Sequence, residues 1–175
     1  MGSRGHTWYD IDFPDVIAER RRYFHETERY HMLGADARET GWLDSIPRGG
    51  TGVVVMEGVS MYLGRQELTG LLAALDAHFS GVRLLVDCYT EFAAKASKYK
   101  NPVNEVGVPQ LYGVDDPKEL ETGKLGFLGE RELTPEELIR ELSGFEQWFF
   151  RRVFAGGMAK KIYRLYEFGT LKPED

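Results

Sequence analysis

Three acidic residues each follow an apolar, strand-like run, and this spacing is the clearest sign of chemistry in the sequence. Asp12 ends the first run, Asp36 follows the second and Glu57 follows the third. The carboxyl ends of parallel strands form the edge at which open α/β sheets bind nucleotide-like ligands. We therefore expect the three carboxylates to line one binding site for a ligand rich in hydroxyl, amino and cationic groups, with which carboxylates form charge-assisted hydrogen bonds.

The elements that must position these residues alternate between strand and helix patterns along the chain. This alternation predicts an α/β fold with a parallel sheet and right-handed crossovers. Strands are expected at 7–12, 30–35, 53–56, 82–88, 125–133 and 161–168, and helices at 14–27, 66–79, 116–122 and from 135 onward. The aromatic residues around 145–150 predict a helical or strongly buried stretch.

The chain has 175 residues, which fits one domain with a substantial core. We expect a single domain over residues 1–175. The alternation of strand and helix patterns weakens at about 95–115, where Lys, Asn, Pro and Gly are frequent. We expect a lid-like or inserted segment there.

Charge and composition exclude several classes of partner. A net charge of −6 without a basic stripe argues against nucleic-acid binding. No apolar run is long enough to cross a membrane, and the polar start predicts no secretory signal. The single cysteine, Cys88, lies in a buried strand pattern and fits a reducing compartment. We predict a cytoplasmic protein without a metal site, because the four histidines lack metal-ligand spacing.

Simpler interpretations compete with the binding site. Asp12 or Asp36 could cap the turn that follows it, and Tyr62 could pack at a helix entrance. Glu57 is harder to explain structurally, because a carboxylate directly after four apolar residues needs a partner or a ligand. The run Gly58–Tyr62 narrowly misses the nucleophile elbow Gly-x-Ser-x-Gly, so a hydrolase is disfavoured.

Three strings of the sequence, in order, carry a family resemblance. They are Trp8–Ile17, Gly34–Arg38 followed by Trp42 and Leu43, and Glu57–Leu63. With them the chain resembles the leucine carboxyl methyltransferases, and in particular the polyketide-type O-methyltransferases. The resemblance implies the class I S-adenosylmethionine-dependent fold: a Rossmann-like sheet with helices on both faces and an antiparallel final strand.

The resemblance also implies roles for individual residues. Asp12 would bind the ribose hydroxyls of S-adenosylmethionine, and Asp36 would accept a hydrogen bond from the adenine amino group, with a backbone contact from Ala37. Glu57 would lie near the methionine end of this cofactor, and Tyr62 would face the methyl acceptor. No residue is predicted to act as a catalytic base, since a carboxylate acceptor is already anionic.

The chain departs from the family before Asp12, because no glycine-rich strand-loop of the type Gly-x-Gly-x-Asp-Thr-Arg precedes it. We therefore expect an N-terminally incomplete methyltransferase domain whose first, central strand is missing. Another chain could fill this gap, or the neighbouring strands could close up. Unpaired strand edges favour pairing between chains, so we expect a homodimer.

The expected function is S-adenosylmethionine-dependent methyl transfer to a carboxylate or phenolic hydroxyl of a small molecule. One alternative is a non-catalytic or truncated methyltransferase-fold module that does not bind the cofactor alone. Another is a nicotinamide-binding Rossmann domain, which accounts for the acid after the second strand but not for Glu57.

Overall fold

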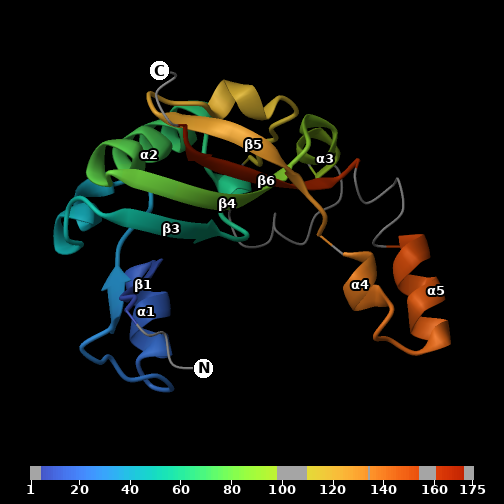
Figure 1. Ribbon diagram of the computed structural model, residues 1–175, viewed down its shortest axis with the longest axis horizontal. Helices are drawn as coiled ribbons and strands as arrows, with labels where there is room; N and C mark the ends of the chain where they lie inside the picture. The colour runs from blue at the N-terminus through green and yellow to red at the C-terminus, as the bar shows by residue number, and fades with distance from the viewer. Residues whose placement is uncertain (1–4, 98–109, 134, 154–160, 172–175) are drawn as a thin grey trace. The chain divides into compact units, whose positions relative to one another are not determined.

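The computed structural model describes residues 5–97, 110–133, 135–153 and 161–171. It divides the chain into two compact units, Met1–Arg48 and Gly49–Asp175 (Figure 1). This division does not test the expectation of a single methyltransferase domain, which stays a prediction. The centre of the expected lid-like segment, residues 98–109, lies outside the described residues, so that expectation also stays a prediction.

The first unit is a two-stranded parallel sheet packed against one helix. Its elements are β1 (Trp8–Asp12), α1 (Pro14–Arg20), β2 (Tyr30–Gly34) and the 3₁₀ helix η1 (Thr40–Ser45). Pro14 begins α1, where the missing N–H has no intrahelical partner to lose. Ile17 of α1 and Met32 of β2 are fully buried and form the centre of this small core.

The helix α1 is shorter than the sequence pattern predicts. It ends at Arg20 rather than near Thr27, and the chain continues in hydrogen-bonded turns. The Arg21 guanidinium donates a 2.6 Å hydrogen bond to the Met32 carbonyl, which ties these turns to β2. The aromatic residues Tyr23 and Phe24 are exposed, so a longer helix would gain little buried apolar surface.

The second unit contains a four-stranded sheet in the order β3–β4–β6–β5 (Figure 1). Strands β3 and β4 are parallel, whereas β6 is antiparallel to both of its neighbours. The predicted antiparallel final strand is therefore confirmed. The strands are β3 (Thr51–Met56), β4 (Gly81–Tyr89), β5 (Leu125–Arg131) and β6 (Tyr163–Thr170).

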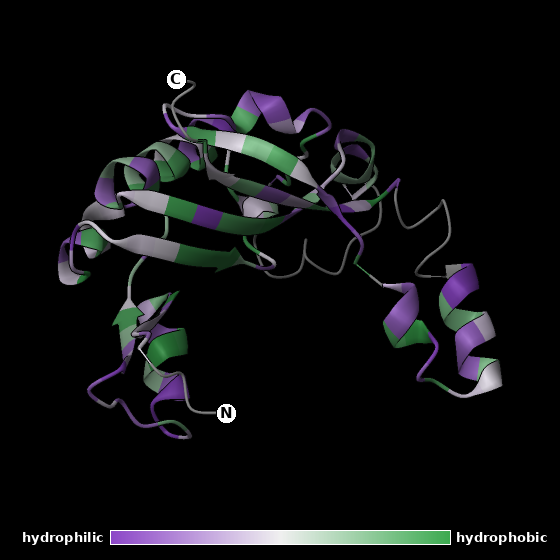
Figure 2. Cartoon of the chain, viewed as in Figure 1, coloured by the Kyte–Doolittle hydropathy of each residue, from purple (hydrophilic) through white to green (hydrophobic). Residues whose placement is uncertain are grey.

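The core of this unit lies between the sheet and α2 (Arg65–His78). The helix buries leucines that recur with the expected 3.6-residue period. On the sheet, alternate residues of β4 and β6 are buried, and apolar stretches run along the strands (Figure 2). The most fully buried of these residues are Leu68, Leu72, Leu75, Leu84, Val86, Tyr166 and Phe168.

Shorter elements surround the sheet. They are the 3₁₀ helices η2 (Ser60–Tyr62) and η4 (Pro117–Leu120) and the helices α3 (Glu91–Ser97), α4 (Glu136–Ile139) and α5 (Gly144–Val153). The sequence pattern does not predict α3, and the helix expected over 116–122 is a single 3₁₀ turn. The predicted helix after residue 135 corresponds to α4. The stretch around 145–150 is helical, as α5, and not strongly buried, since Phe145 and Trp148 are exposed.

Candidate functional site

The first unit brings two of the predicted acidic residues to one edge of its sheet. Asp12 is the last residue of β1 and lies opposite Gly34, the last residue of β2. The Ala35 N–H donates a 2.8 Å hydrogen bond to the Asp12 carbonyl, so the pairing continues to the point where Asp36 follows. Because the strands are parallel, Asp12 and Asp36 both follow their carboxyl ends, as the sequence predicts.

A glycine permits the close approach that shapes this edge. A Cβ added at Gly34 would lie 3.0 Å from the Cα of Pro14, the first residue of α1. Any larger residue would push the start of the helix away from the end of β2. The Asp12 side chain itself is exposed, and one of its oxygens accepts a 2.8 Å hydrogen bond from the Phe13 N–H.

A cavity of about 700 Å³ opens beside the end of β2. Its walls include Phe13, Asp36 and Trp42. The indole nitrogen of Trp42 is buried and has no hydrogen-bond partner within the described part of the chain. Small-molecule sites typically have volumes of about 300–1,000 Å³, so this cavity has room for a ligand such as a nucleoside.

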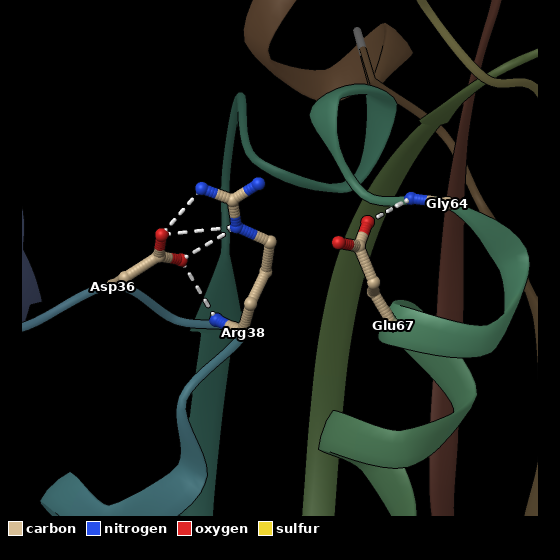
Figure 3. Close-up of polar contacts among 4 residues, drawn as sticks. All are labelled: Asp36, Arg38, Gly64 and Glu67. Carbon is tan, nitrogen blue, oxygen red and sulfur yellow. Dashed lines mark hydrogen bonds and ion pairs between the residues drawn. The ribbon is translucent and has the colours of Figure 1, made fainter.

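The carboxylate of Asp36 is held by Arg38 (Figure 3). The Arg38 Nε lies 2.9 Å from both carboxylate oxygens, and the Arg38 backbone N–H donates to one of them, also at 2.9 Å. The hydrogen bond from Arg38 lowers the pKa of Asp36 and keeps it ionised. The structural alternative, in which Asp36 organises the following turn, is therefore present in the structure. The contacts of Asp36 and Ala37 with adenine stay predictions.

In the second unit, Glu57 directly follows β3 and its side chain is exposed. The next residue, Gly58, has φ +68°, a left-handed conformation that favours glycine and turns the chain sharply after the strand. The third predicted acid therefore also lies at the carboxyl end of its strand. Its contact with the cofactor stays a prediction.

A second carboxylate, which the sequence analysis missed, lies close to this turn. Asp87 of β4 is only 3% exposed. The Gly58 N–H donates to both of its oxygens, at 3.0 and 2.8 Å, and the Tyr163 hydroxyl donates to Oδ2. Burial and the neighbouring Asp87 raise the pKa of Tyr163, which therefore stays protonated as a donor. The signal that could have identified Asp87 is its own position, because it is a carboxylate within the apolar run of β4.

Tyr62 ends η2 and its side chain is exposed, so it is available to a ligand. The following helix, α2, begins after Gly64, whose N–H donates a 2.7 Å hydrogen bond to Glu67 (Figure 3). This bond satisfies a backbone donor at the helix start. The structure thus fixes the backbone beside Tyr62, and the contact of Tyr62 with a methyl acceptor stays a prediction.

Two further properties bear on the kind of site. Among the described residues, no group of three or more His, Cys, Asp and Glu side chains is placed to hold a metal ion. No helix in the described segments is long and apolar enough to cross a bilayer.

Sequence comparison then gives two relatives. The chain is 27% identical over 143 residues to the tetracenomycin polyketide synthesis O-methyltransferase TcmP of Streptomyces glaucescens, covering 81% of this chain and 53% of that protein. It is 32% identical over 130 residues to the S-adenosyl-L-methionine-dependent methyltransferase dpfgK of Gibberella zeae, covering 67% of this chain and 44% of that protein. The chain is a homologue of S-adenosylmethionine-dependent methyltransferases. The resemblance inferred from the three strings is confirmed.

This methyltransferase homologue spans about half the length of the curated relatives it matches. No protein-family model matches it.

Solved structures support the same fold. A protein from Thermobifida fusca described as a methyltransferase matches with a TM-score of 0.60 and 11% identity, covering 95% of this chain and 63% of that chain. Magnesium protoporphyrin IX methyltransferase from Synechocystis matches with a TM-score of 0.51 and 10% identity, covering 96% of this chain and 66% of that chain. The predicted fold class, a Rossmann-like methyltransferase sheet, is confirmed.

Proposed function

We propose that this chain binds S-adenosylmethionine and takes part in transferring its methyl group to an oxygen atom of a small molecule, either a carboxylate or a phenolic hydroxyl. The observation that carries the proposal is the placement of Asp12 and Asp36 at one carboxyl edge of a parallel strand pair, beside a cavity. Both relatives are described as methyltransferases, and one of them as an O-methyltransferase.

The residues at this edge fit the chemistry of the cofactor. Asp12 is exposed and offers carboxylate oxygens to the ribose hydroxyls. Asp36 is ionised and held in place, and an amino group in the cavity could donate to it. Phe13 adds an aromatic surface on which a base could stack.

When bound, S-adenosylmethionine supplies an electrophilic methyl group, which an acceptor oxygen takes by in-line displacement, leaving a neutral thioether. The protein's part is to bind and orient. The exposed carboxylate of Glu57 would attract the cationic end of the cofactor, and the exposed ring of Tyr62 would face the acceptor. A carboxylate acceptor attacks as an anion, so positioning would supply most of the rate and no general base is required. A phenolic acceptor would in addition release its hydroxyl proton to solvent.

The test is calorimetric titration of the chain with S-adenosylmethionine and S-adenosylhomocysteine. We expect saturable binding that Asp12→Asn and Glu57→Gln each weaken by about tenfold, since a hydrogen bond to a charged group contributes about 1.5–3 kcal/mol. The matched controls are Asp44→Asn and Glu141→Gln, which neutralise exposed carboxylates away from the strand ends, and they should bind as wild type does. Failure of a folded chain to bind either compound would favour the alternative, a methyltransferase-fold module that does not bind the cofactor alone.

We also propose that the chain forms a homodimer through strand edges. In the described residues β3 pairs only with β4, and β1 only with β2, so each has one edge without a neighbouring strand. Such edges favour pairing with another chain. Sedimentation equilibrium at micromolar concentration should give twice the mass of the chain, and a monomer would contradict the proposal.

A further inference from the structure

Asp87 is a buried carboxylate to which the proposed function assigns no part. It lies near the end of β4, and a carboxylate in such a position is costly unless it is hydrogen-bonded. Its partners come from two other elements: Gly58 is 29 residues away in sequence, and Tyr163 is 76 residues away. The carboxylate therefore joins the turn after β3 to the start of β6.

The contact with Gly58 fixes the turn that follows Glu57. Both Asp87 oxygens accept from the Gly58 N–H, and the Ser60 hydroxyl donates to the Asp87 carbonyl. Two points of the turn are thus tied to the same residue of β4. Because Glu57 directly precedes Gly58, these bonds restrict the backbone from which the Glu57 side chain projects.

Tyr163 holds the other side of the Asp87 carboxylate. It is the first residue of β6 and lies opposite Tyr89 of β4, with the two rings in edge-to-face contact at a centroid distance of 5.5 Å. This packing directs the Tyr163 ring, and its hydroxyl reaches Asp87 Oδ2. A carboxylate with donors on both sides has one preferred orientation.

We propose that Asp87 and Tyr163 are positioning residues that hold Glu57 in the orientation in which it binds the methionine end of S-adenosylmethionine. The inference rests on the proposed function. It assigns no direct ligand contact to either residue, because their hydrogen bonds are directed at the protein.

A double-mutant cycle tests this inference. Tyr163→Phe removes one hydroxyl and keeps the ring, and Glu57→Gln removes the charge that is being positioned. We expect each variant alone to weaken S-adenosylmethionine binding by about tenfold, as for residues in one hydrogen-bonded network. In the Glu57→Gln protein, Tyr163→Phe should cause little further loss, because no carboxylate remains to be oriented.

The matched control is Tyr89→Phe, which removes the hydroxyl from the other ring of the pair and should bind as wild type does. If the losses from Tyr163→Phe and Glu57→Gln are additive, or if Tyr163→Phe lowers the melting temperature without changing affinity, the positioning role is wrong. In either case wild type still binds and the proposed function survives. A folded wild-type chain that binds neither S-adenosylmethionine nor S-adenosylhomocysteine overturns both proposals.

Discussion

Arg38 holds the carboxylate of Asp36 through two guanidinium nitrogens: Nε lies 2.9 Å from each carboxylate oxygen, and Nη2 lies 2.5 Å from Oδ2. The two residues are separated only by Ala37 in the turn after β2, so the pair forms locally and does not depend on distant packing. Its effect is to keep Asp36 ionised and to limit its rotation at the edge of the candidate site.

The first prediction concerns the pKa of Asp36. Arg38→Ala should raise it from its depressed value toward the ordinary value of about 3.9. Because the folded-state pKa is depressed, the pair contributes stability at pH values above the ordinary pKa, and this contribution is lost as the pH falls through the folded pKa. Carboxyl ¹³C titration by NMR measures the shift. Arg38→Lys keeps the positive charge but not the two guanidinium nitrogens that contact the carboxylate, so it should give an intermediate pKa for Asp36. An unchanged pKa in Arg38→Ala would contradict the pairing.

A second prediction concerns the contact between Gly113 and the end of β4. A Cβ at position 113 would lie 2.4 Å from the backbone carbonyl carbon and oxygen of Thr90, which have little room to move. Gly113→Ala should therefore lower the free energy of unfolding in urea by about 1–3 kcal/mol. Gly129→Ala is the control, since nothing lies within 4 Å of its added Cβ. Equal stability of the two variants would count against this contact.

The third prediction is a stabilising change in α2. Gly70 lies inside this helix, is exposed, and has open space where a Cβ would be added. Gly70→Ala should raise the free energy of unfolding by about 0.8–1 kcal/mol, because alanine loses less backbone entropy in a helix. Gly50→Ala also has open space, but φ there is +65°, so it should destabilise instead. Thermal unfolding distinguishes the two directions.

The fourth prediction concerns the reactivity of Cys88. Burial raises the pKa of this thiol to about 11, so it stays protonated near neutral pH. We expect slow modification by a thiol-reactive disulfide in the native protein and rapid modification in denaturant. Rapid labelling of the native protein would show that the end of β4 opens readily.

The sequence predicts those parts of the fold in which burial follows a simple period. The apolar run before Glu57 and the alternating run around Leu84 are strands as expected, and the leucine period of α2 gives that helix correctly. The length of a helix is harder to predict. For example, α1 ends at Arg20, before the exposed aromatic residues Tyr23 and Phe24. The helix α3 spans only seven residues, too few for periodicity to distinguish it from a loop.

Some residues of the candidate site can likewise be predicted from local sequence, and one of them cannot. Asp12, Asp36 and Glu57 each stand at the end of an apolar run, so their positions can be inferred from neighbours in the chain. Asp87 lies inside such a run, and its hydrogen-bond partners are 29 and 76 residues away. Contacts at that separation depend on how the strands are ordered, which local sequence patterns do not specify.

The place of β6 in its sheet has a consequence for how the protein folds as it leaves the ribosome. Strand β6 is made after β5, yet it lies between β5 and β4. When β5 emerges, β6, its partner strand among the described residues, has not been synthesised, and the edges of β4 and β5 that pair with β6 stay without hydrogen-bond partners until residues 163–170 appear. The nascent chain therefore carries unpaired strand edges through this interval, when chaperones would protect it from aggregation.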